Sequence, residues 1–245
     1  MNASTTPDSA IGQGSVLLVF DIDGTVCEST EVHERAFASA LAEYGCGGVQ
    51  PPEEALVHYT DACYYRETFR AAHGRVPTED EFTAFEARFS ALFQVLLTRE
   101  TLLPVAGVAR FFRALEAMSS AQWCFATGSF RDAAKRKLET LGLVQDATVL
   151  VSASEFESRE AIVEAAVAAC GWRCGPQVYL VGDGLWDYRA AARLGVRCIA
   201  MNMPADQQAA LPREVPRFAD FRNVRGILQL LRTAADPTPP MLDDV

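Results

Sequence analysis

The ten residues VLLVFDIDGT, at positions 16–25, decide the fold. A continuous Val, Leu and Phe run is typical of a strand buried on both faces, and it ends in Asp21 and Asp23. These acids therefore follow the carboxyl end of a strand, where open α/β sheets bind ligands. Side chains at i and i+2 of an extended segment point to one side, so both carboxylates can face one volume and one cation, such as Mg²⁺. An ordinary acidic turn is the alternative.

The rest of the sequence predicts an α/β fold, a doubly wound parallel sheet with an inserted helical domain. From Val105 onward, short apolar strands alternate with helical stretches, the pattern of βαβ units. We expect strands at 123–126, 149–151, 178–181 and 196–200. We expect the intervening helices at 108–118, 131–141, 159–169 and 185–194.

The segment 28–100 interrupts this alternation with helical patterns alone. Helices are expected at 31–44, at 53–72, and from a capping box at Thr78 onward. In the third helix, phenylalanines recur at three- and four-residue steps and predict a core-facing stripe. The expected organisation is a flexible tail at 1–14, a core at 15–27 and 101–233, a helical insert at 28–100, and a flexible tail at 234–245.

Composition excludes several classes of protein. The net charge of −10 over 245 residues gives no electrostatic footprint for nucleic acid or an anionic membrane. No apolar run has the length of a membrane span, and residues 1–14 lack the regions of a signal peptide, so the expected location is the cytoplasm. Seven cysteines, an odd number without framework spacing, indicate reduced thiols rather than a disulfide scaffold. The sequence leaves the oligomeric state open.

Polar residues also follow the later strands. Thr127 and Gly128 open a helix, where backbone N–H groups bind anions and glycine allows a close approach; a simple helix N-cap is the alternative. Asp183 ends a strand, and Asp187 lies one helical turn further on, so the two acids can face one point. Asp187 could equally just stabilise its helix N-terminus. Arg159 opens another helix and can bridge carboxylates and a phosphate, unless it is a solvated first-turn arginine.

Taken together, these residues resemble the four motifs of the haloacid dehalogenase (HAD) superfamily. The motifs match at DIDGT (21–25), at Thr127-Gly128, at Arg159, and from Gly182-Asp183 to Asp187. The resemblance spans about residues 15–232, and the helical insert is similar to the family's C1 cap, a lid over the active site. The resemblance thus implies a HAD-like Rossmannoid core with a cap.

The resemblance also implies a mechanism. Asp21 would attack the substrate phosphorus and form an aspartyl-phosphate, and Asp23 would act as general acid and then general base. Thr127 and the Gly128 amide would hold phosphate oxygens, and Arg159 would neutralise the transferring group. Mg²⁺ would bind the Asp21 carboxylate, the Asp23 carbonyl and Asp183, with Asp187 as a ligand or a support.

One departure concerns the third motif, which is usually lysine. Only Arg159 fits it here, although Lys135 or Lys137 could substitute from the preceding helix.

Among the reactions of the superfamily, hydrolysis of a small organic phosphate monoester is the interpretation we favour. Dehalogenases generally lack an acid at the position of Asp23, and the phosphonate hydrolase needs a cap lysine, which residues 28–100 do not contain. A sugar phosphomutase uses the same two aspartates and stays open, as does a catalytically idle binding module. Insert residues that could read the leaving group are Glu28, His58, Tyr64, Tyr65, Arg66 and Arg70.

Overall fold

The computed structural model describes residues 15–145 and 147–235. The tail predicted at 1–14 lies outside the described residues. So does the tail predicted at 234–245, apart from the end of helix α9 (Val224–Ala235).

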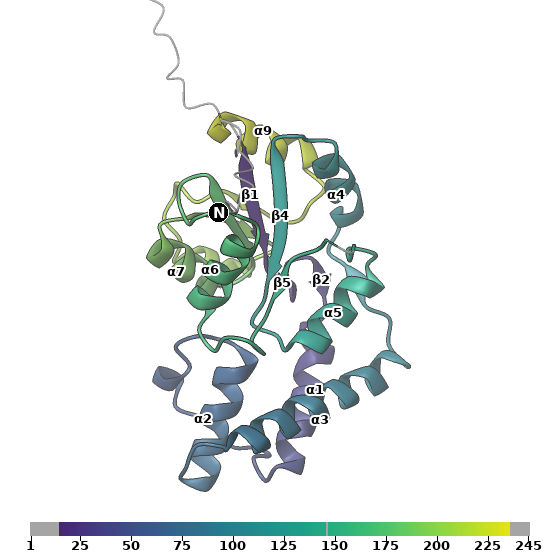
Figure 1. Cartoon of the computed structure of the whole chain (residues 1–245), viewed down its shortest axis with the longest axis vertical. Helices are drawn as coiled ribbons and strands as arrows, with labels where there is room; N and C mark the ends of the chain where they lie inside the picture. Colours follow the sequence, from purple (N-terminus) through teal and green to yellow (C-terminus); the bar gives the residue numbers. More distant parts are fainter. Residues whose placement is uncertain (1–14, 146, 236–245) are drawn as a thin grey trace, which may run out of the picture.

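The core is a six-stranded parallel sheet with helices on both faces, as the sequence predicts (Figure 1). The strand order is β5-β4-β1-β6-β7-β8. The strands are β1 (Val16–Phe20), β4 (Ala121–Ala126), β5 (Leu150–Val151), β6 (Val178–Gly182), β7 (Arg197–Met201) and β8 (Arg217–Phe218). The core helices that precede α9 are α4 (Val108–Glu116), α5 (Arg131–Thr140), α6 (Arg159–Ala169), α7 (Leu185–Leu194) and the short α8 (Ala205–Gln208).

Strand β1 lies at the centre of this sheet, between β4 and β6. All five of its residues are buried, which explains the uninterrupted apolar run. The chain adds β4 and β5 on one side of β1 and then crosses over to add β6, β7 and β8 on the other. The carboxyl ends of β4, β1 and β6 therefore lie next to one another, at the point where the winding reverses.

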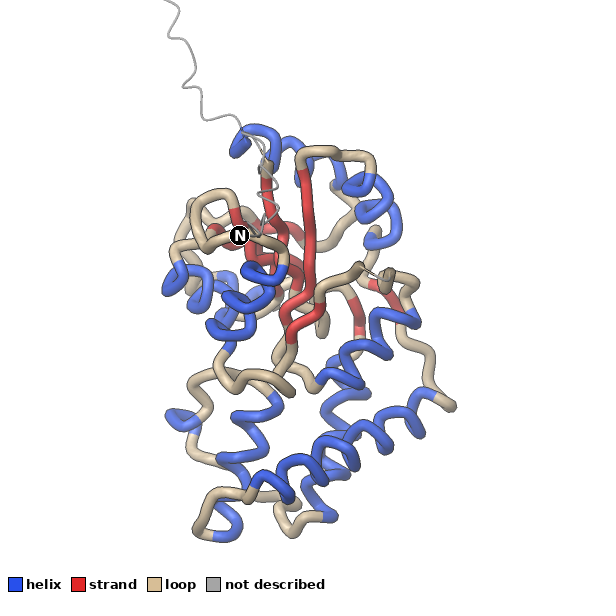
Figure 2. The backbone as a smooth tube through the Cα atoms, in the orientation of Figure 1, coloured by secondary structure: helices blue, strands red, loops and turns tan. Residues whose placement is uncertain are grey.

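The insert is built from helices and their connecting loops and lies beyond that edge of the sheet (Figure 2). It contains α1 (Thr30–Glu43), the 3₁₀ turn η1 (Glu53–Ala55), α2 (Asp61–His73) and α3 (Glu79–Leu97). The chain enters and leaves it through a two-stranded antiparallel ribbon, β2 (Cys27–Glu28) with β3 (Leu103–Pro104).

Two details of the insert bear on the sequence analysis. The helix expected from residue 53 begins only at Asp61, because the Thr60 hydroxyl accepts a hydrogen bond from the Cys63 amide and caps the helix there. The capping box at Thr78 is present, and the phenylalanine stripe of α3 is buried as predicted. The ring of Phe130, from the core, packs against the rings of Phe82 and Phe89 and joins the core to the insert.

Within the described part of the chain, no helix combines the length and apolarity needed to cross a membrane.

Candidate active site

Four chain segments bring the predicted site residues together at the carboxyl edge of the sheet. Asp21 follows β1, Thr127 follows β4 and Asp183 follows β6, while Arg159 opens α6. Parallel neighbouring strands end at the same edge, so residues far apart in sequence meet there. The side chains border a cavity of about 680 Å³ between the sheet and the insert; the predicted residues that line it are Asp21, Asp23, Thr127, Gly128, Arg159 and Asp183.

Three carboxylates form an acidic cluster at this edge. Asp21, Asp183 and Asp187 each offer an oxygen, and these oxygens lie within 4.8 Å of one another. The Asp21 Oδ1 atom is buried and accepts no hydrogen bond from any described residue. Gly24 has a φ of +70°, and a Cβ there would lie 1.9 Å from Asp183 Oδ2, so the loop after β1 requires glycine for this close approach.

The electrostatics of the cluster show that Arg159 does not fully offset its negative charge. Burial, together with the neighbouring Asp21 and Asp187 carboxylates, raises the pKa of Asp183 to about 9, although Arg159 opposes the shift. Burial likewise raises the pKa of Asp21 to about 7, although Arg159 opposes the shift. The donor set consists of hard carboxylate oxygens, one of them without a partner. Such a set fits a divalent cation such as Mg²⁺.

Arg159 is the cation of the site. Its guanidinium is buried, and Nη1 lies 2.9 Å from Asp187 Oδ1 and 3.5 Å from Asp21 Oδ1. Its Nη2 donates to the backbone carbonyl of Tyr59, in the insert. Asp187 does not line the cavity: its other oxygen accepts from the Gly184 amide, so this carboxylate holds Arg159 in place beside Asp21.

Thr127 and Gly128 form the loop between β4 and α5. The Thr127 hydroxyl accepts a hydrogen bond from the Ser129 amide at 3.1 Å, which fixes the turn. A Cβ on Gly128 would lie 2.6 Å from Arg159 Nη2 and 2.9 Å from the Tyr59 carbonyl. Glycine is required here because Arg159 and the insert both press against the loop backbone.

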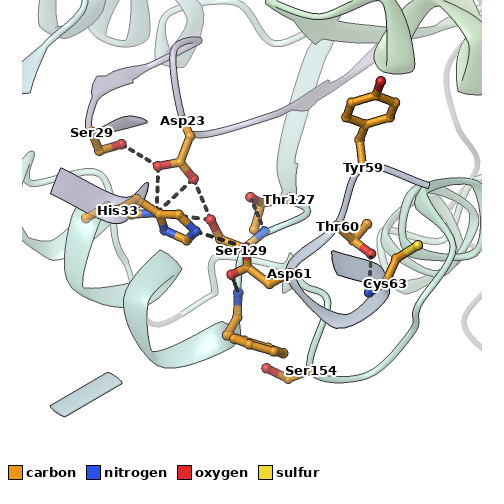
Figure 3. A network of polar contacts seen from close by, with 12 residues as sticks. Asp23, Ser29, His33, Tyr59, Thr60, Asp61, Cys63, Thr127, Ser129 and Ser154 are labelled. Atoms are coloured by element: carbon orange, nitrogen blue, oxygen red, sulfur yellow. Dashed lines mark hydrogen bonds and ion pairs between the residues drawn. The ribbon is translucent and has the colours of Figure 1, made fainter. Parts of the chain in front are cut away.

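Asp23 faces a separate group of polar side chains (Figure 3). Its carboxylate accepts hydrogen bonds from Ser29 Oγ at 2.6 Å and from Ser129 Oγ at 2.5 Å. Lys137 Nζ, on α5, lies 2.6 Å from Asp23 Oδ1, and its side chain has no exposure to solvent. Burial by itself would raise the pKa of Asp23, but Lys137, His33 and the Ser129 hydroxyl together outweigh burial, and the pKa is lowered.

This group extends into the insert through His33 and Asp61. His33 Nδ1 lies 2.9 Å from Lys137 Nζ, and His33 Nε2 lies 2.9 Å from Asp61 Oδ1. These partners fit a tautomer that accepts from Lys137 at Nδ1 and donates to Asp61 from Nε2. Asp61 Oδ2 in turn accepts from the Phe130 amide of the core. We call Asp23, Ser29, His33, Asp61, Ser129 and Lys137 the Asp23 network.

The structure therefore distinguishes the three basic residues considered for the third motif. Arg159 lies beside Asp21, whereas Lys137 binds Asp23 and Lys135 lies on the surface near Glu139. Apart from Asp23, sequence reasoning missed the Asp23 network as a group. One signal was available: Lys137 falls on the buried face of α5, four residues after Ala133, where an unpaired charge would be costly.

The insert residues that were considered for reading the leaving group lie in different places. Tyr64 lines the cavity. Tyr65 is buried and stacks on Phe85, and Arg66 pairs with Glu79 and Glu157. Glu28, His58, Tyr65, Arg66 and Arg70 are not among the residues that border the cavity.

Comparison with known proteins agrees with this geometry. Residues 16–195 match the family of haloacid dehalogenase-like hydrolases. No curated protein matches the sequence. Among solved structures, a predicted phosphoglycolate phosphatase from Haemophilus somnus is 21% identical, with a TM-score of 0.62 and coverage of 88% of this chain and 99% of that one.

Two further solved structures are similar. CbbY from Rhodobacter sphaeroides, in complex with phosphate, is 18% identical with a TM-score of 0.67, covering 86% of this chain and 96% of that chain. A hydrolase from Pseudomonas syringae is 16% identical with a TM-score of 0.63, and the alignment covers 87% of this chain and 97% of that chain. At these sequence identities, the similarity to the solved structures shows the fold alone. The family match extends over most of the chain, and the chain belongs to the haloacid dehalogenase-like hydrolases.

Proposed function

We propose that this hydrolase is a Mg²⁺-dependent phosphatase that cleaves a small organic phosphate monoester through an aspartyl-phosphate on Asp21. The observation that carries the proposal is the buried Oδ1 of Asp21, which accepts no hydrogen bond and is held at the end of β1 beside Arg159 and Asp183. A carboxylate oxygen that is free of hydrogen bonds and lies beside a cation can act as a nucleophile on a phosphate. The seven free thiols suit a reducing compartment such as the cytoplasm.

In the first step, Asp21 attacks the substrate phosphorus, and the bond from phosphorus to the ester oxygen breaks. Asp23 donates a proton to that oxygen, so the leaving group departs as an alcohol. Arg159 stabilises the negative charge of the transferring group, and Thr127 with the Gly128 amide holds its oxygens.

In the second step, water attacks the phosphorus of the aspartyl-phosphate, and Asp23 takes a proton from that water. Inorganic phosphate leaves, and Asp21 is free again. The Lys137 ammonium favours the ionised form of Asp23, which is the form that this step requires; the first step uses the minor, protonated form, which the proton taken from water restores.

The metal would be held by the carboxylates of Asp21 and Asp183, with the Asp23 carbonyl as a further ligand. Asp187 would support the site through Arg159. When bound, Mg²⁺ supplies positive charge that offsets the repulsion between these carboxylates and the substrate phosphate.

We further propose that residues 28–100 act as a cap over a core formed by 15–27 and 101–233. The segment before α2 lies directly on the site: the Asp61 amide donates to the Gly128 carbonyl, and the Thr60 hydroxyl donates to the Glu157 carbonyl. A cap in this position excludes water from the first step and encloses the leaving group.

Phosphate release from a panel of phosphate monoesters, with Mg²⁺ or with EDTA, tests the proposal. Release that requires Mg²⁺, together with a phosphorylated peptide containing Asp21 after acid quenching, is the expected result. Isomerised sugar phosphate without free phosphate would support the mutase. No turnover of any substrate would support the binding module, which the presence of both Asp21 and Asp183 disfavours.

A second prediction concerns stability as a function of pH. The folded-state pKa values of about 7 for Asp21 and about 9 for Asp183 exceed the ordinary value of 3.8. At a pH between the ordinary pKa and the folded-state pKa of each group, the folded protein holds a proton that the unfolded chain has released. Without metal, the free energy of unfolding should therefore fall as pH rises through this range. Mg²⁺ binds the deprotonated form and should therefore raise Tm more at about pH 8 than at about pH 5. Thermal melting with Mg²⁺ or EDTA measures both effects.

Asp183→Asn is the informative variant for this prediction. It should be more stable than wild type without metal at the higher pH, and it should lose most of its response to Mg²⁺. Asp80→Asn, an exposed carboxylate on α3, should behave as wild type. A Mg²⁺ shift that is equal at both pH values, or that persists in Asp183→Asn, would contradict the prediction.

A further inference from the structure

The cavity is divided between a charged floor and a largely apolar roof. The floor is the sheet edge with Asp21, Arg159 and Asp183, and the roof comes from the insert together with Trp186 at the start of α7. The phosphoryl group belongs on the floor, so the roof surrounds the leaving alcohol. This step rests on the proposed phosphatase function.

The charges around the cavity can compensate one phosphate only. Among the described residues that line it, Arg159 is the single arginine, and no lysine is present. Arg159 is already engaged by Asp187 and lies beside Asp21. His33 is placed between Lys137 and Asp61. The carboxylates that line the cavity are Asp21, Asp23, Glu34, Asp61 and Asp183.

A second anionic group on the substrate would therefore meet negative charge. Glu34 is exposed on α1 at the insert side of the cavity and has no ion-pair partner among the described residues. Like charges without a counter-ion repel one another, and the repulsion grows as a bound substrate displaces water from between them. A carboxylate or a second phosphate on the leaving group has no cation to bind.

The roof instead offers apolar and aromatic surface. The rings of Tyr59 and Trp186 stack with centroids 5.0 Å apart, and both residues line the cavity. Tyr59 adopts a φ of 49°, unusual for a residue with a Cβ, and the Arg159 contact to its carbonyl helps to fix this shape. Phe37 and Leu41 contribute further apolar wall.

Apart from Glu34 and the His33–Asp61 pair, the polar groups of the roof are uncharged. The Tyr64 hydroxyl donates to Gln50 Oε1 at 3.0 Å, and both residues line the cavity. The Gln50 side-chain amide can still donate to a hydroxyl or carbonyl oxygen of the leaving group.

We infer that the substrate is the monophosphate of an uncharged alcohol with an apolar or aromatic body, and that the site discriminates against bisphosphates and phosphorylated acids. Shape and apolar contact favour such an alcohol, and the excess of carboxylates around the cavity, with Glu34 unpaired, disfavours an anionic one. The same charge distribution disfavours a phosphomutase that passes through a bisphosphate, because the second phosphate has no binding group in the roof.

A matched pair of substrates tests the inference: benzyl phosphate and 4-carboxybenzyl phosphate, which differ by one remote charge. In the full-length protein with Mg²⁺, kcat/KM for benzyl phosphate should exceed that for the carboxylated ester by about 100-fold. Glucose 1-phosphate and glucose 1,6-bisphosphate form a second pair, for which the monophosphate should be the better substrate.

Gln50→Lys supplies the cation that the roof lacks. This variant should reduce the discrimination within the benzyl pair by about tenfold or more, mainly through KM of the carboxylated ester. Gln94→Lys, the same change at an exposed position of α3 outside the cavity, should leave the ratio unchanged.

The outcomes separate this inference from the proposed function. Equal use of both benzyl esters, preference for the anionic partner of either pair, or an unchanged ratio in Gln50→Lys would overturn the inference and leave the phosphatase intact. Absence of Mg²⁺-dependent release from every ester would overturn the proposed function and the inference with it.

Discussion

Asp21→Asn protein is expected to release phosphate about 10⁴-fold more slowly than wild type, or slower still. An amide has nearly the shape of the carboxylate but cannot attack phosphorus, so the covalent route is lost while the cavity is kept. Phosphate release under saturating Mg²⁺ measures the rate, and acid quenching should show no phosphorylated peptide.

The fold of this variant should survive. Burial raises the pKa of Asp21, so the ionised carboxylate is costly in the metal-free protein and a neutral isostere relieves that cost. Thermal melting without metal should therefore give a Tm no lower than that of wild type. Asp80→Asn supplies the control for activity. If Asp21→Asn kept more than a few per cent of the wild-type rate, Asp21 would not be the nucleophile.

Lys137→Met is expected to lower the free energy of unfolding by about 3 kcal/mol. The side chain of Lys137 is fully buried, and its ammonium is the nearest counter-charge to Asp23. Methionine fills a similar volume but leaves the Asp23 carboxylate with hydroxyl donors only. Urea denaturation at neutral pH measures the loss.

A double-mutant cycle separates the ion pair from simple packing. Lys137→Met combined with Asp23→Asn should recover most of the lost stability, because neither side chain is then charged. Lys135→Met, two residues away on the same helix but exposed, should cost less than about 0.5 kcal/mol. Equal effects of Lys135→Met and Lys137→Met would refute a buried ion pair at Asp23.

The sheet could be predicted because its strands are short apolar runs buried on both faces. β1 is the clearest example: five apolar residues end in two acids, and the structure places it at the centre of the sheet. The order of the motifs along the chain then implied that their residues share one edge, since parallel strands end together. The match of 16–195 to the family confirms the predicted fold class.

The Asp23 network could not be predicted from spacing. Lys137 and Asp23 are 114 positions apart in the sequence, and Asp61 and Phe130, which share a hydrogen bond, are 69 positions apart. No local period encodes such pairs; they depend on how the insert docks on the core. Sequence reasoning could show at most that a lysine on the apolar face of α5 needs a partner, without naming it.

Local chemistry explains where the predicted boundaries failed. The helix expected from residue 53 breaks into a 3₁₀ turn and then an irregular segment up to Thr60, which contacts the core instead of continuing the helix. The strand β8 is only two residues long and sits at the edge of the sheet, so its sequence carries no clear alternation.

The ribbon of β2 and β3 has a consequence for how such a protein can change over evolutionary time. Cys27 pairs with Pro104 and Glu28 with Leu103, so the two crossings between core and insert lie one strand spacing apart. Whatever is spliced between them leaves the course of the core chain unaltered. Selection can therefore replace or resize the insert and so change the leaving group that the cavity accepts. The core residues that bind and transfer the phosphoryl group keep their positions. Grafting another family member's insert at this junction is the corresponding route for an engineer.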